Sequence, residues 1–99
     1  MDFAVKNFEW DPGKNRENTR KHGISFEEAV LIFEGPVLTQ IDMRFDYGEV
    51  RELSLGTIEG VVVIVVVHTP RMTKVRLISA RVANKKERNL YHEHLSKKT

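Results

Sequence analysis

The longest apolar run of the chain lies between Gly60 and His68, and it organises the predicted fold. Residues 61–67 are seven consecutive β-branched residues. Branching at Cβ disfavours a helix, and the run is too short to cross a membrane, so the pattern predicts a central strand buried on both faces. The polar residues that follow, His68 and Thr69, mark the end of the strand where a functional group would emerge.

Other segments have the alternation or β-branched composition of strands that would pair with this central one. These strands are predicted at residues 3–10, 37–42, 49–55 and 75–81. In the third of them Arg51 shares a face with Leu53 and Leu55, so it should emerge at the rim of a packed surface, where it needs a carboxylate or phosphate partner. This strand is expected to break at Gly56. Hairpins are expected at residues 57–60 and 69–74.

Three segments have the start and stop signals of helices. Asp11 and Pro12 open a helix that Gly23 ends, and Ser25 with Glu28 forms a capping box that opens a second helix over residues 26–33. Asn84 opens a third helix, to about Leu95, with Glu87, Leu90, Tyr91 and His94 along one side. Only the second helix has a clear apolar stripe for packing on a sheet.

The segment from Pro12 to His22 has no large apolar residue, so its helix should lie exposed on the surface. Two interpretations stand. The segment is either a solvated helix tethered at its two ends, or a cationic arm that contacts RNA or a partner protein. The candidate RNA-binding residues of such an arm are Lys14, Arg20, Lys21 and His22.

The last strand contains two arginines that suit phosphate binding. Arg76 and Arg81 are five residues apart, so a regular strand directs their side chains to opposite faces, and both cannot hold the same phosphate. One of them is then structural, unless the strand bulges or Arg81 lies beyond its end. We expect Arg81, beside the last helix, to belong to the site.

The length indicates one domain over residues 1–99, and a disordered basic tail is expected at residues 96–99. The chain has no cysteine, which suits a reducing compartment, and no signal-peptide pattern begins it, so we expect a cytoplasmic protein. Charge is segregated: residues 24–60 carry eight acidic and two basic residues, whereas residues 81–99 carry six basic and two acidic ones. This segregation permits a basic surface, although a charged run is often only a solvated face.

Several motifs, in order along nearly the whole chain, resemble the BrnT family of type II toxins. These motifs are Phe8-Glu9-Trp10-Asp11-Pro12, residues 21–29 (Lys-His-Gly-Ile-Ser-Phe-Glu-Glu-Ala), Glu49-Val50-Arg51, His68-Thr69 and residues 76–81 (Arg-Leu-Ile-Ser-Ala-Arg) with Glu87 and Tyr91. The resemblance implies a small α+β fold with an antiparallel sheet and packed helices, similar to RelE-type ribonucleases, and an RNA-cleaving activity that arrests growth. It also implies a ribbon-helix-helix antitoxin, BrnA, which neutralises the toxin and through which alone the complex contacts operator DNA.

RNA cleavage without a metal needs a proton acceptor for the 2′-hydroxyl, cations for the phosphate and a proton donor for the leaving oxygen. His68 is the candidate acid or base, because imidazole titrates near neutral pH. Arg51 and either Arg76 or Arg81 are candidates for the phosphate. Glu87 or Tyr91 would orient them or shuttle a proton.

No cofactor or metal site is expected, because His92 and His94 are two residues apart and face different directions on a helix. No membrane association is expected either. Two functions remain open. The first is an endoribonuclease toxin, and the second is a basic binding module that holds an antitoxin or nucleic acid without turnover.

Overall fold

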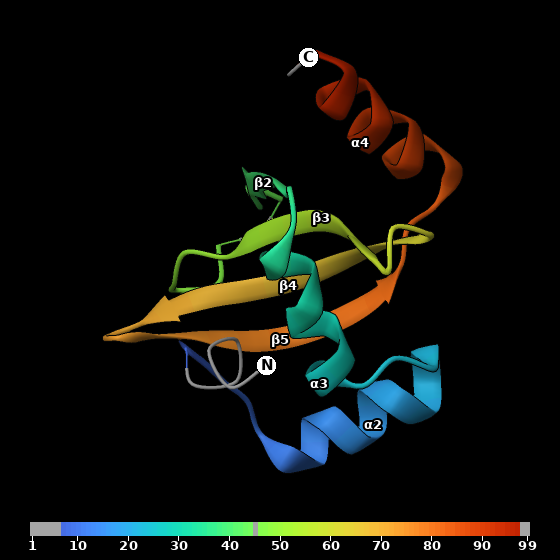
Figure 1. Ribbon diagram of the computed structural model, residues 1–99. Helices are drawn as coiled ribbons and strands as arrows, with labels where there is room; N and C mark the ends of the chain where they lie inside the picture. The colour runs from blue at the N-terminus through green and yellow to red at the C-terminus, as the bar shows by residue number, and fades with distance from the viewer. Residues whose placement is uncertain (1–6, 45, 98–99) are drawn as a thin grey trace.

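The computed structural model describes residues 7–44 and 46–97, which form an α+β fold around one mixed sheet of five strands in the order β1-β5-β4-β3-β2 (Figure 1). The elements are β1 (Phe8–Glu9), α2 (Pro12–His22), α3 (Phe26–Ala29), η1 (Val30–Glu34), β2 (Leu38–Ile41), β3 (Glu52–Ile58), β4 (Val62–Arg71), β5 (Lys74–Val82) and α4 (Lys85–Lys97). Among them, none is a helix long and apolar enough to span a membrane.

The predicted α+β class is confirmed, but the sheet is not antiparallel throughout. β2, β3, β4 and β5 pair antiparallel in sequence order, whereas β1 pairs parallel with β5. The strand predicted over residues 3–10 is only two residues long in the described part, and residues 3–6 lie outside the described residues. The chain leaves the sheet at Trp10 because Asp11 and Pro12 begin α2, as predicted.

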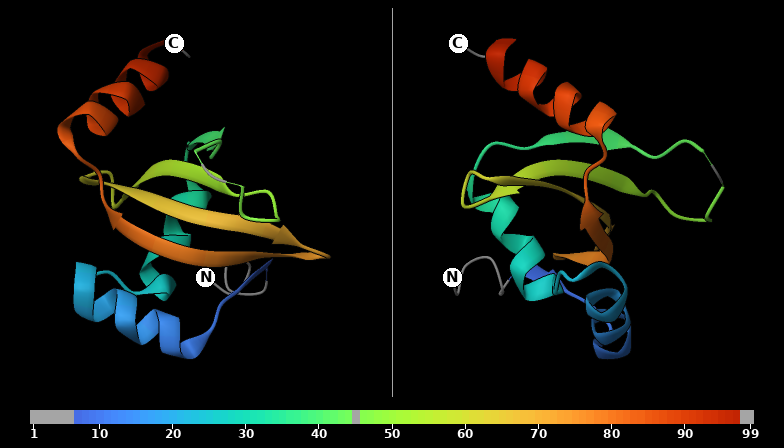
Figure 2. Two further views of the ribbon diagram at one scale, coloured as in Figure 1. Left: turned by 180° about the vertical axis from the view of Figure 1, so that it is seen from behind. Right: turned by 90° about the vertical axis from the view of Figure 1, so that its right-hand side faces the viewer.

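The two faces of the sheet differ in what covers them. α3 and η1 lie across one face, which we call the covered face, and the buried residues Phe26, Ile32, Ile64, Val66 and Leu77 form part of its core. Seen from behind, the other face has no described helix across its middle (Figure 2, left). We call it the open face.

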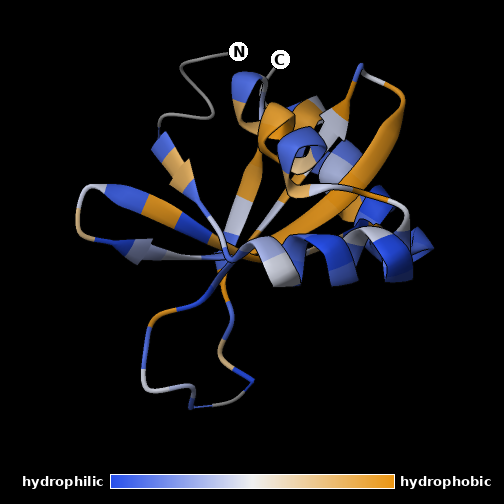
Figure 3. Cartoon of the chain, turned by 90° about the horizontal axis from the view of Figure 1, so that it is seen from below, coloured by the Kyte–Doolittle hydropathy of each residue, from blue (hydrophilic) through white to orange (hydrophobic). Residues whose placement is uncertain are grey.

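Two segments flank the open face without closing it. At one end the ring of Tyr91 in α4 packs against Leu55, Val63 and Val65. On the same side of the sheet, opposite α3 and η1, the loop of residues 42–51, described at residues 42–44 and 46–51, projects beyond the strands (Figures 2 and 3). The open face is therefore a shallow platform with α4 along one end and this loop along another.

β3 does not break at Gly56, contrary to the sequence prediction. It continues to Ile58, and Gly56 pairs with Ile64 in the middle of the sheet. A Cβ atom at Gly56 would lie 2.7 Å from the Cβ of Ile32 and 3.2 Å from Cγ1 of Val37. Close packing of η1 on the strand requires a glycine at this position. In the sequence alone, the same glycine indicates a turn.

β4 and β5 change register next to His68. Val67 pairs with Ser79, but His68 pairs with Leu77. Ile78 is therefore an extra residue on β5, and the shift is a β-bulge. The hairpin that joins the two strands is also shorter than predicted, because β4 extends to Arg71 and β5 begins at Lys74.

The bulge places Arg76 and Arg81 on the same face of the sheet. Arg81 pairs with Val65 and Arg76 with Thr69, two β4 residues four positions apart. The expectation that the two arginines serve different faces is wrong, because a bulge resets the alternation of side chains and leaves no mark in the sequence pattern. Both arginines belong to the open face.

α2 is held at the edge of β5 by one buried asparagine rather than by an apolar stripe. Nδ2 of Asn18 donates to the carbonyl oxygens of Ile24 and Ala80, each at 2.9 Å, and Oδ1 accepts from the amide of Ala80 at 3.1 Å. Asn18 thus pairs with the edge of β5 as a further strand would. Asn15 fixes the next segment, since its Oδ1 accepts from the amide of Phe26 at 2.8 Å. These contacts explain a helix without a hydrophobic face.

The remaining helices differ from prediction at their C-terminal ends. The capping box of Ser25 and Glu28 is confirmed, but the helix predicted over residues 26–33 becomes a 3-10 helix from Val30 onward. The predicted capping by Asn84 is also confirmed, since its side chain accepts from the amide of Glu87 at 2.8 Å. α4 then continues to Lys97, so residues 96 and 97 are helical rather than a disordered tail, and residues 98 and 99 lie outside the described residues.

Candidate functional site

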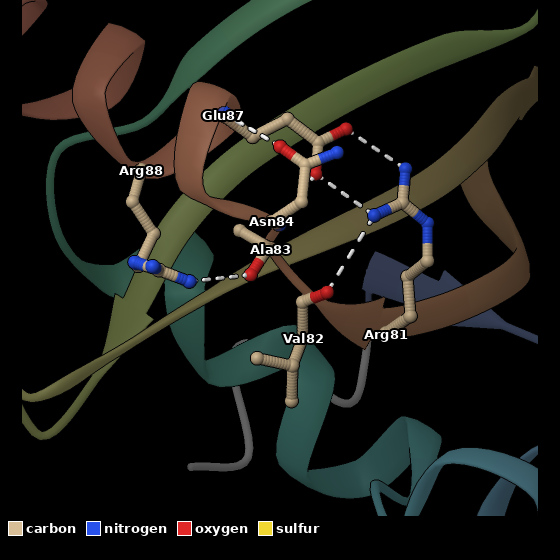
Figure 4. A network of polar contacts seen from close by, with 6 residues as sticks. All are labelled: Arg81, Val82, Ala83, Asn84, Glu87 and Arg88. Carbon is tan, nitrogen blue, oxygen red and sulfur yellow. Dashed lines mark hydrogen bonds and ion pairs between the residues drawn. The ribbon is translucent and has the colours of Figure 1, made fainter.

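An ion pair between Arg81 and Glu87 joins β5 to the first turn of α4 at the border of the open face (Figure 4). Nη1 and Nη2 of Arg81 donate to the two carboxylate oxygens of Glu87, each at 2.8 Å. Glu87 also accepts from the amide of Asn84 at 2.9 Å. The hydrogen bond from Arg81 lowers the pKa of Glu87 and the same bond raises the pKa of Arg81, so both groups are charged at neutral pH.

The pair leaves one edge of the Arg81 guanidinium available. Nη1 is shared between Glu87 and the carbonyl oxygen of Val82, whereas Nε makes no hydrogen bond to any described residue. A guanidinium has five N–H groups in a planar fork, so the edge formed by Nε and Nη2 can still bind an anion in bidentate fashion. Arg81 can therefore keep its contact with Glu87 while it binds a phosphate.

Arg44, which no sequence pattern selects, lies close enough to this pair for its charge to act on both Arg81 and Glu87. The buried carboxylate of Asp42 fixes it by accepting from Nε at 2.9 Å and from Nη2 at 3.0 Å. Tyr47 donates to the same carboxylate at 3.1 Å. These bonds hold the pKa of Asp42 far below its usual range. From the sequence this segment is only an acid-containing turn. The ion pair of Asp42 with Arg44 is not predictable, because it depends on the shape of the loop.

The other two arginines of the open face also have carboxylate partners. Nε of Arg51 donates to Glu49 at 3.2 Å, and its guanidinium lies 4.0 Å from the centre of the Tyr47 ring. Nη1 of Arg76 donates to Glu9 of β1 at 3.3 Å. The partner predicted for Arg51 is present. Each of these guanidinium groups has more N–H donors than its ion pair uses, so donors remain for an anion.

The open face thus has arginines around its rim and uncharged residues in its middle. Strand pairing aligns Gln40, Leu53, Val67 and Ser79 in one row across the sheet. The rim arginines are Arg44, Arg51, Arg76 and Arg81. Such a surface suits an extended polyanion whose phosphates contact the rim.

His68 is not brought together with these arginines. Its ring is buried on the covered face, in edge contact with Phe33 at 5.4 Å between centroids, and Nε2 lies 2.7 Å from Oγ of Ser54. Nδ1 makes no hydrogen bond among the described residues and lies 3.5 Å from Oε1 of Glu52. Burial lowers the pKa of His68, and the charge of Glu52 opposes this shift. Serine, histidine and glutamate in this order resemble a nucleophilic triad, but Ser54 is 0% exposed, so no substrate can reach it.

Tyr91 is not placed with the arginines either. Its side chain is buried in the core under α4, and its hydroxyl donates to the carbonyl oxygen of Pro36 at 2.8 Å. This contact anchors α4 to the segment before β2. Of the residues that the sequence analysis proposes on the last helix, only Glu87 borders the open face.

The basic residues of α2 divide between its sides. Asn18 faces β5 and Asn15 faces α3, so Lys14 and Lys21, seven residues apart, share the flank that turns away from α3, toward the open face. Neither lysine forms an ion pair with a described residue. Arg20 points outward and pairs with Glu17. His22 lies on the flank of Asn15.

Comparison with known families supplies the identity of the chain. The family model described as the ribonuclease toxin BrnT of a type II toxin-antitoxin system matches residues 10–87. The chain belongs to the BrnT family. The family resemblance seen in the sequence is therefore confirmed, and the BrnT match spans α2 and all four arginines of the open face together with Glu87, whereas Tyr91 lies outside it.

A solved structure shows that the fold is also that of a BrnT protein. The crystal structure of the ribonuclease toxin BrnT from Brucella abortus matches with a TM-score of 0.59 and 24% sequence identity, over 77% of this chain and 94% of the other. Comparison with curated proteins gives no match. The likeness of this BrnT chain to RelE-type ribonucleases stays a prediction. Among the described residues, no group of three or more His, Asp or Glu side chains is arranged to hold a metal ion.

Proposed function

We propose that this BrnT-family chain is an endoribonuclease toxin that binds RNA across its open face and cleaves it beside Arg81. The observation that supports the site most directly is that four arginines from two separate segments, the β2–β3 loop and β5, lie around the one sheet face that no described helix crosses. The arginines would contact several phosphates of an RNA strand at once, while the bases of the strand lie over the uncharged row of the open face.

In this proposal Arg81 binds the scissile phosphate. The 2′-oxygen attacks phosphorus and the bond to the 5′-oxygen breaks, while solvent water accepts the 2′-hydroxyl proton and supplies one to the departing 5′-oxygen. Negative charge increases on the phosphate oxygens during this step, and the planar cation of Arg81 stabilises the transition state more than the bound substrate. Glu87 is a positioning residue, because its carboxylate holds the guanidinium through two 2.8 Å bonds. The lowered pKa of Glu87 makes it an acceptor at neutral pH rather than an acid.

Arg44, Arg51 and Arg76 would hold neighbouring phosphates, and Lys14 and Lys21 would extend the contact at the edge of β5. His68 has no role in RNA contact in this proposal, since it is buried on the other face. Tyr91 has a structural role, because it is buried under α4 and its hydroxyl donates to the carbonyl oxygen of Pro36. We also propose that the reaction needs no metal ion.

The remaining parts of the proposal follow from membership of a type II toxin-antitoxin family. We propose that a BrnA-type ribbon-helix-helix antitoxin neutralises the chain and supplies the only contact with operator DNA. The toxin would act in the cytoplasm, where its RNA substrate is found. The alternative function, a binding module without turnover, would use the same arginines to hold an antitoxin or nucleic acid.

Arg81 provides the test of this function. Cleavage of a single-stranded RNA of mixed sequence should fall about a hundredfold or more in Arg81→Ala, because one preorganised donor to the reacting phosphate is lost. Arg81→Lys should restore little, since lysine lacks the planar fork. Arg16→Ala, on the outer side of α2, is the matched control and should cleave at the wild-type rate.

The same assay separates the alternatives. Cleavage that persists in EDTA at the wild-type rate is expected for the proposed reaction. If the wild-type chain binds the RNA but never cleaves it, and its expression does not arrest growth, the endoribonuclease proposal is wrong and the binding module is favoured. Unchanged cleavage in Arg81→Ala would exclude the proposed site while leaving the activity in place.

A further inference from the structure

The outer edge of β2 has no partner among the described strands. The amide of Asp42 donates to the carbonyl oxygen of Arg51 at 2.8 Å, so residues 38, 40 and 42 use their backbone groups to pair with β3. The N–H and C=O groups of Thr39 and Ile41 therefore point outward. No hydrogen bond between described residues reaches these four groups.

β2 is short, which limits pairing at an edge, but the strand lacks the other features by which sheets avoid further pairing. Leu38-Thr39-Gln40-Ile41 contains no charged residue and no proline, and its pairing with β3 has no bulge. At the opposite edge of the sheet, by contrast, outward backbone groups of β5 have partners. There β1 pairs with part of β5, and Asn18 occupies the backbone groups of Ala80.

Apolar side chains are exposed beside the same edge. Ile41, Met43 and Val50 are 58%, 82% and 54% exposed, although residues of this size and chemistry are usually covered. All three line a surface hollow of about 360 Å³ between the end of β2 and the loop of residues 42–51. A hollow of this kind fits one or two apolar side chains of an added strand.

The charge around the hollow indicates the chemistry of its occupant. Arg44 neutralises Asp42 and Arg51 neutralises Glu49. Two carboxylates remain without a cationic partner among the described residues: Asp46, in the lining of the hollow, and Glu52, the cross-strand neighbour of Ile41. The histidine beside Glu52 is kept neutral by burial, which lowers its pKa. An occupant with a lysine or arginine next to its apolar residues is favoured.

We infer that β2 is the docking edge for the antitoxin, and that an extended segment of the antitoxin adds to the sheet as a sixth strand. Its backbone would pair with Thr39 and Ile41, an apolar side chain would enter the hollow, and a basic side chain would approach Asp46 or Glu52. This inference rests on the proposed function, because it assigns a surface to the proposed partner. A second copy of the chain would offer only the uncharged β2 and would leave both carboxylates without a cation.

The experiment measures the affinity of the purified chain for the antitoxin encoded beside its gene. Ile41→Lys places a charge in the hollow, and Ile41→Pro removes an outward N–H without removing a bond to β3. Each should weaken binding roughly tenfold or more, as loss of a central contact does. Val61→Lys is the matched control, because Val61 is 79% exposed at the opposite end of β3 and should bind as the wild type does.

Each variant is also assayed for RNA cleavage without antitoxin, which should stay at the wild-type rate because Ile41 lies outside the arginine rim. Wild-type affinity in both Ile41 variants would overturn the docking edge while leaving the toxin assignment intact. Failure of the neighbouring gene product to bind the wild-type chain would instead overturn the proposed partner and the docking edge with it. If light scattering shows that the chain alone forms a dimer, and Ile41→Lys abolishes it, the edge is a self-interface and the inference is wrong.

Discussion

The residue type of His68 suggests catalytic chemistry, but the regular alternation of β4 places it on the covered face with Ile64 and Val66. The sequence places the histidine at the polar end of the central strand, where imidazole chemistry is expected. In the structure its side chain lies on the covered face, paired with Ser54 and packed on Phe33, while the bulge at Ile78 turns Arg76 toward the other face. The residue type therefore indicates a catalytic group, whereas the direction of the side chain makes it part of the core.

The buried His68 should make the stability of the protein depend on pH. Burial lowers its pKa in the native state, whereas in the unfolded chain the pKa returns to about 6.5. Below that value the unfolded state binds a proton that native His68 does not, so the free energy of unfolding falls as the pH decreases through about 6.5 and levels off below the native pKa. Urea unfolding of wild type and His68→Gln at pH 8, 7, 6 and 5 measures this loss.

His68→Gln should show a flatter pH dependence than the wild type, because its amide can still bond to Ser54 but does not titrate. His92→Gln, on the exposed side of α4, serves as the control and should retain the wild-type dependence. Parallel curves for wild type and His68→Gln would show that the buried imidazole titrates normally.

At the scale of elements, prediction from the sequence succeeds where a local signal fixes the backbone. Asp11 and Pro12 open α2, Ser25 and Glu28 open α3, and the β-branched run forms β4, each from residues within one turn or strand. Prediction fails where tertiary contact decides. Gly56 has the sequence signal of a strand end because glycine disfavours strands, yet it continues β3 beneath Ile32.

Gly56→Ala should destabilise the protein by about 1–3 kcal/mol, because the added methyl group forces the strand and η1 apart. Thermal unfolding or urea unfolding measures the change. Gly35→Ala is the matched control, since a Cβ atom at Gly35 would have no neighbour within 4 Å and its φ is −124°, and it should shift stability by less than about 0.5 kcal/mol. Equal stability of the two variants would show that η1 adjusts to the sheet without strain.

The candidate site is only partly predictable for the same reason. Residue type and position select Arg51, Arg76, Arg81 and Glu87, and the structure places all four on the open face or at its border. They do not select Arg44, because its position depends on the bidentate contact with Asp42 inside an irregular loop. Tyr91 offers a phenol that suits the chemistry, but its hydroxyl bonds to a backbone oxygen in the core.

At the scale of the whole molecule, a nearly neutral total charge conceals a division between surfaces. The net charge is +2, yet four acidic residues lie around the end of β2 and its loop (Asp42, Asp46, Glu49 and Glu52), whereas basic residues border the open face and line α2. The molecule can therefore attract a polyanion on one side and a basic partner segment on another. The two flanks of α2 also differ in charge. One flank packs on α3, whereas the other presents two lysines that pair with no described carboxylate.

Lys14 and Lys21 should contribute to RNA binding through charge alone. Removing both in Lys14→Ala/Lys21→Ala should weaken binding to all RNA sequences alike and reduce the slope of log affinity against log salt by about 1.4, since each phosphate contact of a single strand contributes about 0.7. The double variant Arg16→Ala/Arg20→Ala removes the same formal charge from the outer side of α2 and should leave the slope nearly unchanged. Fluorescence anisotropy of a labelled RNA between 50 and 300 mM salt, roughly the range in which counterion release dominates, measures both slopes. An equal decrease in the two double variants would mean that RNA responds to the net charge of α2 and not to the flank beside the open face.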